Sequence, residues 1–105
     1  MIVPESVEDF ATLLKGDGKF VCYFTAAWCG DCRFIQPHMP SIEAAYPSLT
    51  FVQIDRDQYL EVAKLWDVYG IPSFVVVEKG QELGRFVSRD RKTKEEIEAF
   101  LDGLV

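Results

Sequence analysis

Two cysteines separated by two residues, Cys29 and Cys32, are the side chains in this sequence best suited to covalent chemistry. A pair at this spacing can close into a small disulfide ring or open into a dithiol. The pair belongs to the stretch Trp28–Cys32, W-C-G-D-C, which follows an apolar run over 20–25 and precedes a helix predicted from residue 33. A C-x-x-C motif at a strand-to-helix junction is typical of thiol redox sites. The pattern therefore predicts a redox-active dithiol.

The start of the predicted helix favours a thiolate at Cys29. The first N–H groups of a helix have no intrahelical partner, and the helix dipole favours an anion there. Because the thiolate is the nucleophile, we expect Cys29 to be the more reactive thiol and Cys32, one turn further on, to be partly covered. Cys22 lies inside the apolar run and is expected to be a buried, inert thiol.

A structural zinc site and a pair of incidental buried cysteines are the alternatives. Zinc requires four nitrogen or sulfur ligands in a tetrahedron, and the remaining candidates are Cys22 and His38. Cys22 lies inside the predicted strand and His38 stands between a proline and a methionine, so neither belongs to a second ligand pair. The tryptophan, the glycine and the helix start around the C-x-x-C motif disfavour incidental burial.

Length and composition predict one domain over 1–105. The 105 residues are 49% hydrophobic and 13% aromatic, which excludes a disordered chain. Chains divide into several domains only well above this length. Three cysteines are too few for a disulfide scaffold, and an odd number leaves one unpaired. The net charge of −6 argues against nucleic-acid binding.

Neither a membrane span nor a signal peptide is predicted. No run approaches the ~20 apolar residues that a membrane-spanning helix needs. Residues 1–5 contain neither a basic segment nor an apolar one of the kind that begins a signal peptide. We therefore expect a cytoplasmic protein that has no membrane partner. We also expect a monomer.

Helices and strands are predicted to alternate along the chain. Ser6 with Asp9, and Thr93 with Glu96, have the spacing of helix-capping pairs. Apolar periodicity and turn residues set the remaining bounds. The predicted helices cover 6–15, 33–46, 59–66 and 93–104, and the predicted strands cover 20–25, 49–55, 73–78 and 83–87.

This order predicts an α/β fold with a mixed four- to five-stranded central sheet and helices on both faces. Pro37 and Pro40 interrupt the second helix and predict a kink there. Lys79-Gly80 predicts the turn of a closing hairpin, and Ile2-Val3 is a candidate short edge strand. Sites in such sheets gather at the carboxyl ends of strands, where the C-x-x-C motif falls.

The chain resembles the thioredoxin family over nearly its whole length. The resemblance rests on W-C-G-x-C after a strand, on Pro37 five residues beyond Cys32, on Gly70-Ile71-Pro72 before a strand, and on Lys79-Gly80 in the hairpin. It implies the thioredoxin fold and a protein-disulfide reductase, in which Cys29 attacks a substrate disulfide and Cys32 resolves the mixed disulfide. It also implies a redox-active Cys29–Cys32 disulfide and no bound cofactor.

The resemblance assigns a substrate-binding surface as well. It implies a cis peptide bond between Ile71 and Pro72, with Ile71 offering backbone hydrogen bonds to an extended substrate. Trp28 is expected to be a half-exposed shield for the neighbouring sulfur, and Gly30 keeps the loop free of side-chain bulk. Disulfide-containing proteins are the implied substrates, and a flavoprotein disulfide reductase is the implied electron donor.

A basic run precedes the last helix. It contains five cations and a single acid, Asp90, and the cations are Arg85, Arg89, Arg91, Lys92 and Lys94. In a thioredoxin-like fold the turn at Ser88 and Arg89 lies beside the dithiol, so Arg89 is positioned to meet a substrate and to favour acidic partners. The alternative is an ordinary solvated approach to the helix.

Three positions depart from the family's pattern. Asp31 stands where the family has proline, Tyr23 where it has a buried acid, and Phe51 where it has the lysine that faces this acid. The usual proton acceptor for Cys32 is therefore missing, and Asp31 is the predicted replacement. A carboxylate beside the sulfurs also disfavours a thiolate by like-charge repulsion, which predicts a more reducing dithiol.

A non-catalytic binding module of the same fold is the alternative function. Such a module would use the groove around Ile71-Pro72 to bind a partner. It has no need of two cysteines at this spacing, so the intact C-x-x-C motif favours the reductase.

Overall fold

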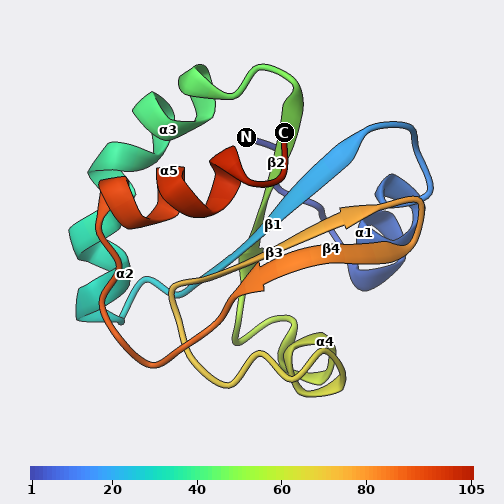
Figure 1. Cartoon of the computed structure of the whole chain (residues 1–105). Coiled ribbons are helices and arrows are strands. Elements are labelled where there is room, and N and C mark those ends of the chain that lie inside the picture. The colour runs from blue at the N-terminus through green and yellow to red at the C-terminus, as the bar shows by residue number, and fades with distance from the viewer.

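The computed structural model describes residues 1–105 and shows a mixed sheet with helices on both faces (Figure 1). The sheet has four strands in the order β2-β1-β3-β4, with β1 parallel to β2 and the other pairs antiparallel. The predicted α/β thioredoxin fold is confirmed. The strands are β1 (Lys19–Thr25), β2 (Leu49–Asp55), β3 (Ser73–Glu78) and β4 (Gln81–Phe86).

Two groups of helices cover the two faces of the sheet (Figure 1). Helices α1 (Val7–Leu13) and α4 (Leu60–Leu65) pack on one face. Helices α3 (Met39–Ala45) and α5 (Lys94–Asp102) pack on the other, and α2 (Gly30–Ile35) extends α3 towards the end of β1. No helix is both long and apolar enough to cross a membrane.

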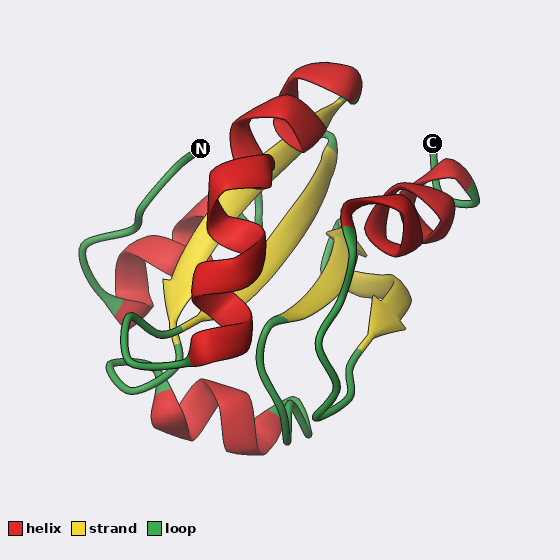
Figure 2. Ribbon diagram, turned by 90° about the vertical axis from the view of Figure 1, so that its left-hand side faces the viewer, coloured by secondary structure: helices red, strands yellow, loops and turns green.

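The predicted kink lies at Pro37. A 3₁₀ turn, η1 (Gln36–His38), separates α2 from α3, because the proline ring cannot continue the α-helical hydrogen-bond pattern. Figure 2 shows the three segments as one helical column against the sheet. The helix begins at Gly30, three residues before its predicted start, so both cysteines of the motif lie at its first turn.

The side chains of β1 alternate between the two cores, as the pleat of a strand requires. Cys22 and Phe24 pack with α1 and α4, whereas Val21 and Tyr23 pack with α3 and α5. Every residue from Phe20 to Thr25 is buried, so β1 is the centre of the fold. Its carboxyl end delivers the chain directly to the C-x-x-C motif.

Local signals account for most of the boundaries. The Ser6 hydroxyl accepts a hydrogen bond from the Asp9 amide at 3.0 Å, and Thr93 forms a complete capping box with Glu96. The hairpin turn has φ of 50° at Lys79 and 78° at Gly80, so β4 begins at residue 81 rather than 83. The fifth strand is reduced to one bridge between residues 2 and 52.

Candidate active site

Cys29 and Cys32 meet at the amino end of α2. Cys29 is the N-cap residue, with an extended backbone (φ −82°, ψ 121°), and Cys32 lies in the first turn. The two residues approach each other to 3.2 Å, and neither forms a disulfide bond. Since a disulfide requires about 2.05 Å between the sulfurs, a small movement would close the ring.

The two thiols differ in accessibility. Cys29 is partly exposed, whereas Cys32 is 2% exposed. Burial raises the pKa of Cys32, and the nearby Thr25 hydroxyl opposes this increase. The accessible sulfur at the helix start is therefore suited to attack, and the buried one to act after it.

The loop before β3 faces Cys29. The Ile71–Pro72 peptide bond is cis, which confirms the prediction. The Cys29 Sγ lies 3.9 Å from the Ile71 carbonyl oxygen, a distance at which the thiol donates a weak hydrogen bond. The backbone that the resemblance assigns to substrate binding therefore lies directly against the more accessible sulfur.

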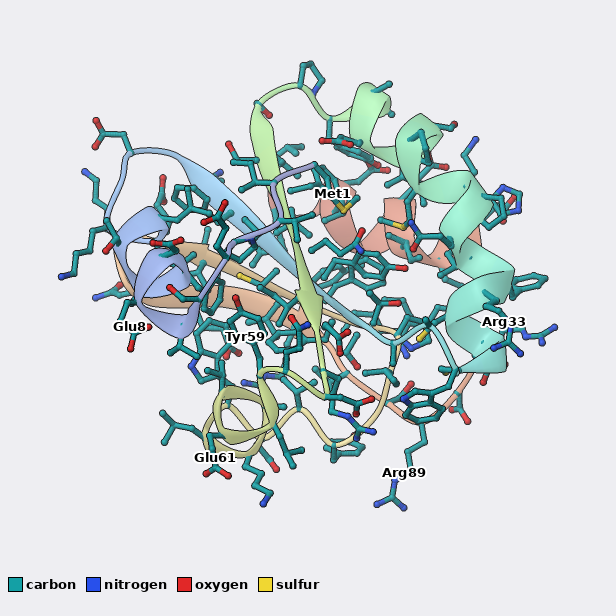
Figure 3. The ribbon with its side chains drawn as sticks, turned by 180° about the vertical axis from the view of Figure 1, so that it is seen from behind. Met1, Glu8, Arg33, Tyr59, Glu61 and Arg89 are labelled. Atoms are coloured by element: carbon teal, nitrogen blue, oxygen red, sulfur yellow. The ribbon has the colours of Figure 1, made fainter.

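The loop before α5 packs against the Ile71–Pro72 loop. A Cβ at Gly70 would collide with the backbone carbonyl of Ser88 and come within 2.9 Å of the Arg89 Cα. The Arg89 guanidinium lies 5.8 Å from the centre of the exposed Tyr69 ring. The Arg89 side chain points away from the protein (Figure 3). Ser88 and Arg89 therefore lie against Gly70, at the start of the Ile71–Pro72 loop, and Arg89 is exposed.

Lys92 is an exception in the basic run, whose three arginines are exposed as in a solvated segment. This lysine is 1% exposed, and its Nζ donates hydrogen bonds to the Asp90 carbonyl (3.0 Å), to the Ser88 hydroxyl (3.1 Å) and to the Ser88 carbonyl (3.3 Å). Burial lowers the pKa of Lys92. The buried ammonium donates hydrogen bonds to three oxygens of its own loop, which lies next to Gly70.

Asp31 is paired with a residue that the sequence does not connect to it. Its Oδ1 lies 3.0 Å from the Arg91 Nε, across 60 residues of sequence. The Arg91 guanidinium also lies 4.2 Å from the centre of the Phe34 ring. The negative charge of Asp31 beside the sulfurs is therefore partly offset by the guanidinium of Arg91, in the loop before α5.

Trp28 is 60% exposed, as the sequence predicts, and it is held in place by polar contacts. Its Nε1 donates a hydrogen bond to the Asp57 Oδ2 at 2.6 Å, which lowers the pKa of Asp57. The Arg56 guanidinium lies 5.4 Å from the centre of the indole ring. The indole is thus a fixed, exposed surface next to Cys29.

Tyr23 occupies the place of the family's buried acid without supplying a base. Its phenol donates a hydrogen bond to the Gln36 Oε1 at 2.8 Å, and its ring stacks on Phe74 at 5.1 Å. Burial raises the pKa of Tyr23 to about 12, so the phenol stays protonated at neutral pH. Phe51 lies in the same apolar cluster.

The remaining thiol, Cys22, lies in the buried strand β1. Cys22 is 0% exposed in β1, and burial raises the pKa of its thiol to about 12, which fits the predicted inert role. The protein contains no group of three or more His, Cys, Asp or Glu side chains placed to hold a metal ion.

Comparison with known proteins agrees with this geometry. A family model described as Thioredoxin matches residues 1–103. Thioredoxin-3, mitochondrial, of Saccharomyces cerevisiae is 37% identical over 82 residues, covering 78% of this chain and 65% of that protein. Human thioredoxin is 36% identical over 90 residues, covering 86% and 83%. The chain therefore spans just under two thirds of the yeast relative's length.

The overall shape is shared with solved structures. The crystal structure of thioredoxin from Trypanosoma brucei brucei superposes with a TM-score of 0.87 at 27% sequence identity. The match covers 99% of this chain and 89% of that one.

Proposed function

This chain belongs to the thioredoxin family, and we propose on that basis that it reduces protein disulfides through its Cys29–Cys32 pair. The observation that carries the proposal is the arrangement of the two sulfurs. Cys29 is partly exposed, is the N-cap residue of α2 and faces the Ile71 carbonyl. Cys32 is buried and lies 3.2 Å from Cys29. Attack by one thiol and resolution by the other require this order of exposure.

The reaction proceeds by two exchanges. The Cys29 thiolate attacks one sulfur of the substrate disulfide, forming a mixed disulfide and releasing the other substrate sulfur as a thiolate, which takes a proton from solvent. The Cys32 thiol then loses its proton and attacks the Cys29 sulfur. The Cys29–Cys32 disulfide forms and the second substrate thiol leaves. The substrate gains two electrons and the dithiol is oxidised.

An extended substrate segment would bind along the Ile71–Pro72 loop. Trp28 precedes Cys29 in the chain and Tyr69 precedes Gly70, and the exposed rings of both offer apolar surface to a peptide. Gly30 leaves space, since a Cβ there would meet only the end of the Arg33 side chain, at 3.9 Å.

Arg89 would favour acidic substrates. Its guanidinium lies at the solvent-exposed edge of this surface, in a protein with a net charge of −6. Rim charges change association rates more than affinity, and salt weakens their effect. Arg89→Glu should slow reduction of an acidic disulfide peptide at low salt more than that of a basic one. Equal effects on the two peptides would assign Arg89 to a solvated face only.

Asp31 would adjust the reduction potential. Its carboxylate disfavours thiolates nearby, and the Arg91 guanidinium at 3.0 Å limits this repulsion. The role of Asp31 as proton acceptor for Cys32 remains a prediction. The proposed electron donor is a flavoprotein disulfide reductase, and the proposed setting is a reducing compartment such as the cytoplasm, with the chain acting as a monomer.

Trapping of the mixed disulfide tests the proposal. Cys32→Ser should accumulate a covalent complex with a disulfide-containing protein, and mass mapping should place the bond at Cys29. Cys29→Ser should form no such complex. A complex through Cys22 or Cys32 would overturn the assignment. Peptide binding by the wild type without any turnover would instead support the non-catalytic binding module.

A further inference from the structure

A cavity with several polar side chains in its lining opens beside the buried Cys32. It has a volume of about 370 Å³ and lies between the carboxyl ends of β1 and β2 and the first turns of α2. Its polar lining comes from Thr25, Arg33, Gln36, Gln53 and Asp55, and small side chains at 26 and 27 leave the space open. A cavity of this size and polarity can hold several water molecules, each needing about 30 Å³.

Thr25 links this cavity to the sulfur. It is 8% exposed and stands two residues beyond Tyr23, so the two side chains share a face of β1. Thr25 and Cys32 line the cavity together, the nearby Thr25 hydroxyl opposes the increase in the pKa of Cys32 and of Tyr23 that burial causes, and Tyr23 donates a hydrogen bond to Gln36. Because the Tyr23 phenol stays protonated, this network contains no base of its own.

Asp55 is the one carboxylate that lines the cavity. It is paired in register with Thr25 across the parallel β1–β2 ladder. Its Oδ1 accepts hydrogen bonds from the Asp57 amide (2.9 Å) and the Gln58 amide (3.4 Å). Its side chain lies at the exposed mouth of the cavity, in contact with solvent.

We propose that the Cys32 proton leaves through this cavity, past the Thr25 hydroxyl, and that the Asp55 carboxylate receives the proton through water. The inference rests on the proposed reductase function and names the proton path of its second step. The Cys32 S–H bond breaks, the Thr25 hydroxyl donates to the thiolate, and cavity water carries the proton to Asp55, which releases it to solvent. The thiolate then forms its bond to the Cys29 sulfur.

Other charged groups around Cys32 do not provide the same path. Lys92 is a cation whose ammonium is bound by three oxygens, and Arg33 donates to the Ala27 carbonyl at 2.9 Å. Asp31 is bound to Arg91 and does not line the cavity. Cys29 is consumed in the mixed disulfide at this step.

The test separates the two exchanges in single-turnover experiments with a fluorescent disulfide peptide, from pH 5.5 to 9. Thr25→Val, which keeps the shape and removes the hydroxyl, should slow resolution about tenfold and move its pH midpoint upwards, because a hydrogen bond to an anion is lost. Thr25→Ser should restore the wild-type rate of resolution and its wild-type pH midpoint. Asp55→Asn, which keeps an acceptor for the Asp57 amide, should slow resolution at neutral pH. Mixed-disulfide formation should be unchanged in all three variants.

Each outcome has a distinct meaning. If the wild type forms no mixed disulfide, the proposed function fails. If it does so but Thr25→Val and Asp55→Asn resolve it at wild-type rates and pH midpoint, the proton path is wrong. If Asp31→Asn alone slows resolution, the proton goes to Asp31. Thermal unfolding of each variant shows whether the fold is intact.

Discussion

The Asp31 carboxylate and the Arg91 guanidinium, 3.0 Å apart, join the first turn of α2 to the loop before α5. The pair lies on the surface, with side chains 35% and 54% exposed, so its contribution to stability is expected to be small. The pair should affect the thiols more strongly, because Asp31 is next to Cys32 in the chain and Arg91 offsets the negative charge that the sulfurs experience.

Substitutions of Asp31 and of Arg91 should shift the reduction potential of the dithiol in opposite directions. Asp31→Asn removes a charge that disfavours thiolates, so the dithiol should become less reducing, by about 15–30 mV. Arg91→Ala frees the carboxylate and should make the dithiol more reducing. Redox titration against glutathione measures both. Shifts of the same sign, or none in either variant, would mean that Asp31 is only a surface acid.

Cys22→Ala should leave turnover intact. The Cys22 thiol is 0% exposed and, with a pKa raised to about 12, stays protonated at neutral pH. Removing its sulfur from the centre of β1 should cost about 1 kcal/mol of unfolding free energy through the space left behind. Urea unfolding and disulfide-reduction rates check the two expectations. A folded Cys22→Ala protein without turnover would add a third redox thiol to the mechanism.

Gly70→Ala should impair substrate reduction and lower stability. A methyl group there would collide with the Ser88 carbonyl, so the Ser88–Arg89 loop must move away from Ile71–Pro72. Such overpacking typically costs about 1–3 kcal/mol. Gly103→Ala is the matched control, because its nearest contact, the Phe100 carbonyl, would be at 3.6 Å. Equal stability and reduction rates for the two variants would show that the loop contact is unimportant.

Lys92→Met should loosen the loop before α5 more than it destabilises the fold. The substitution removes the hydrogen bonds to Ser88 and Asp90 but also removes a buried charge, so the global change should stay within about 1 kcal/mol. Amide hydrogen exchange at 88–91 should accelerate. Lys94→Met, at the first position of α5, is the control. Unchanged exchange in Lys92→Met would show that the ammonium does not hold the loop.

Local signals were sufficient to predict most of the fold. The bounds of β2 and β3 agree with the predicted 49–55 and 73–78, because turn residues flank both apolar runs. The capping pairs at Ser6 and Thr93 and the interruption at Pro37 also act within a few residues of sequence. The cis bond at Pro72 followed from the family resemblance, and no local pattern would have indicated it.

Contacts that depend on how loops meet were not predicted. The Asp31–Arg91 pair spans 60 residues, and the buried Lys92 stands in a basic run that has the composition of a solvated segment. The sequence does contain a local pattern that indicates the cavity beside Cys32. Two small residues, Ala26 and Ala27, follow Thr25 at the end of a buried strand, and they leave space beside the motif's second cysteine.

Reduction of insulin disulfides with dithiothreitol as electron donor tests the central claim most directly. The claim is that Cys29 attacks and Cys32 resolves. The wild type should accelerate insulin precipitation well above the dithiothreitol background, and Cys29→Ser should fall to that background while remaining folded. Full activity in Cys29→Ser, or background activity in the folded wild type, would contradict the claim.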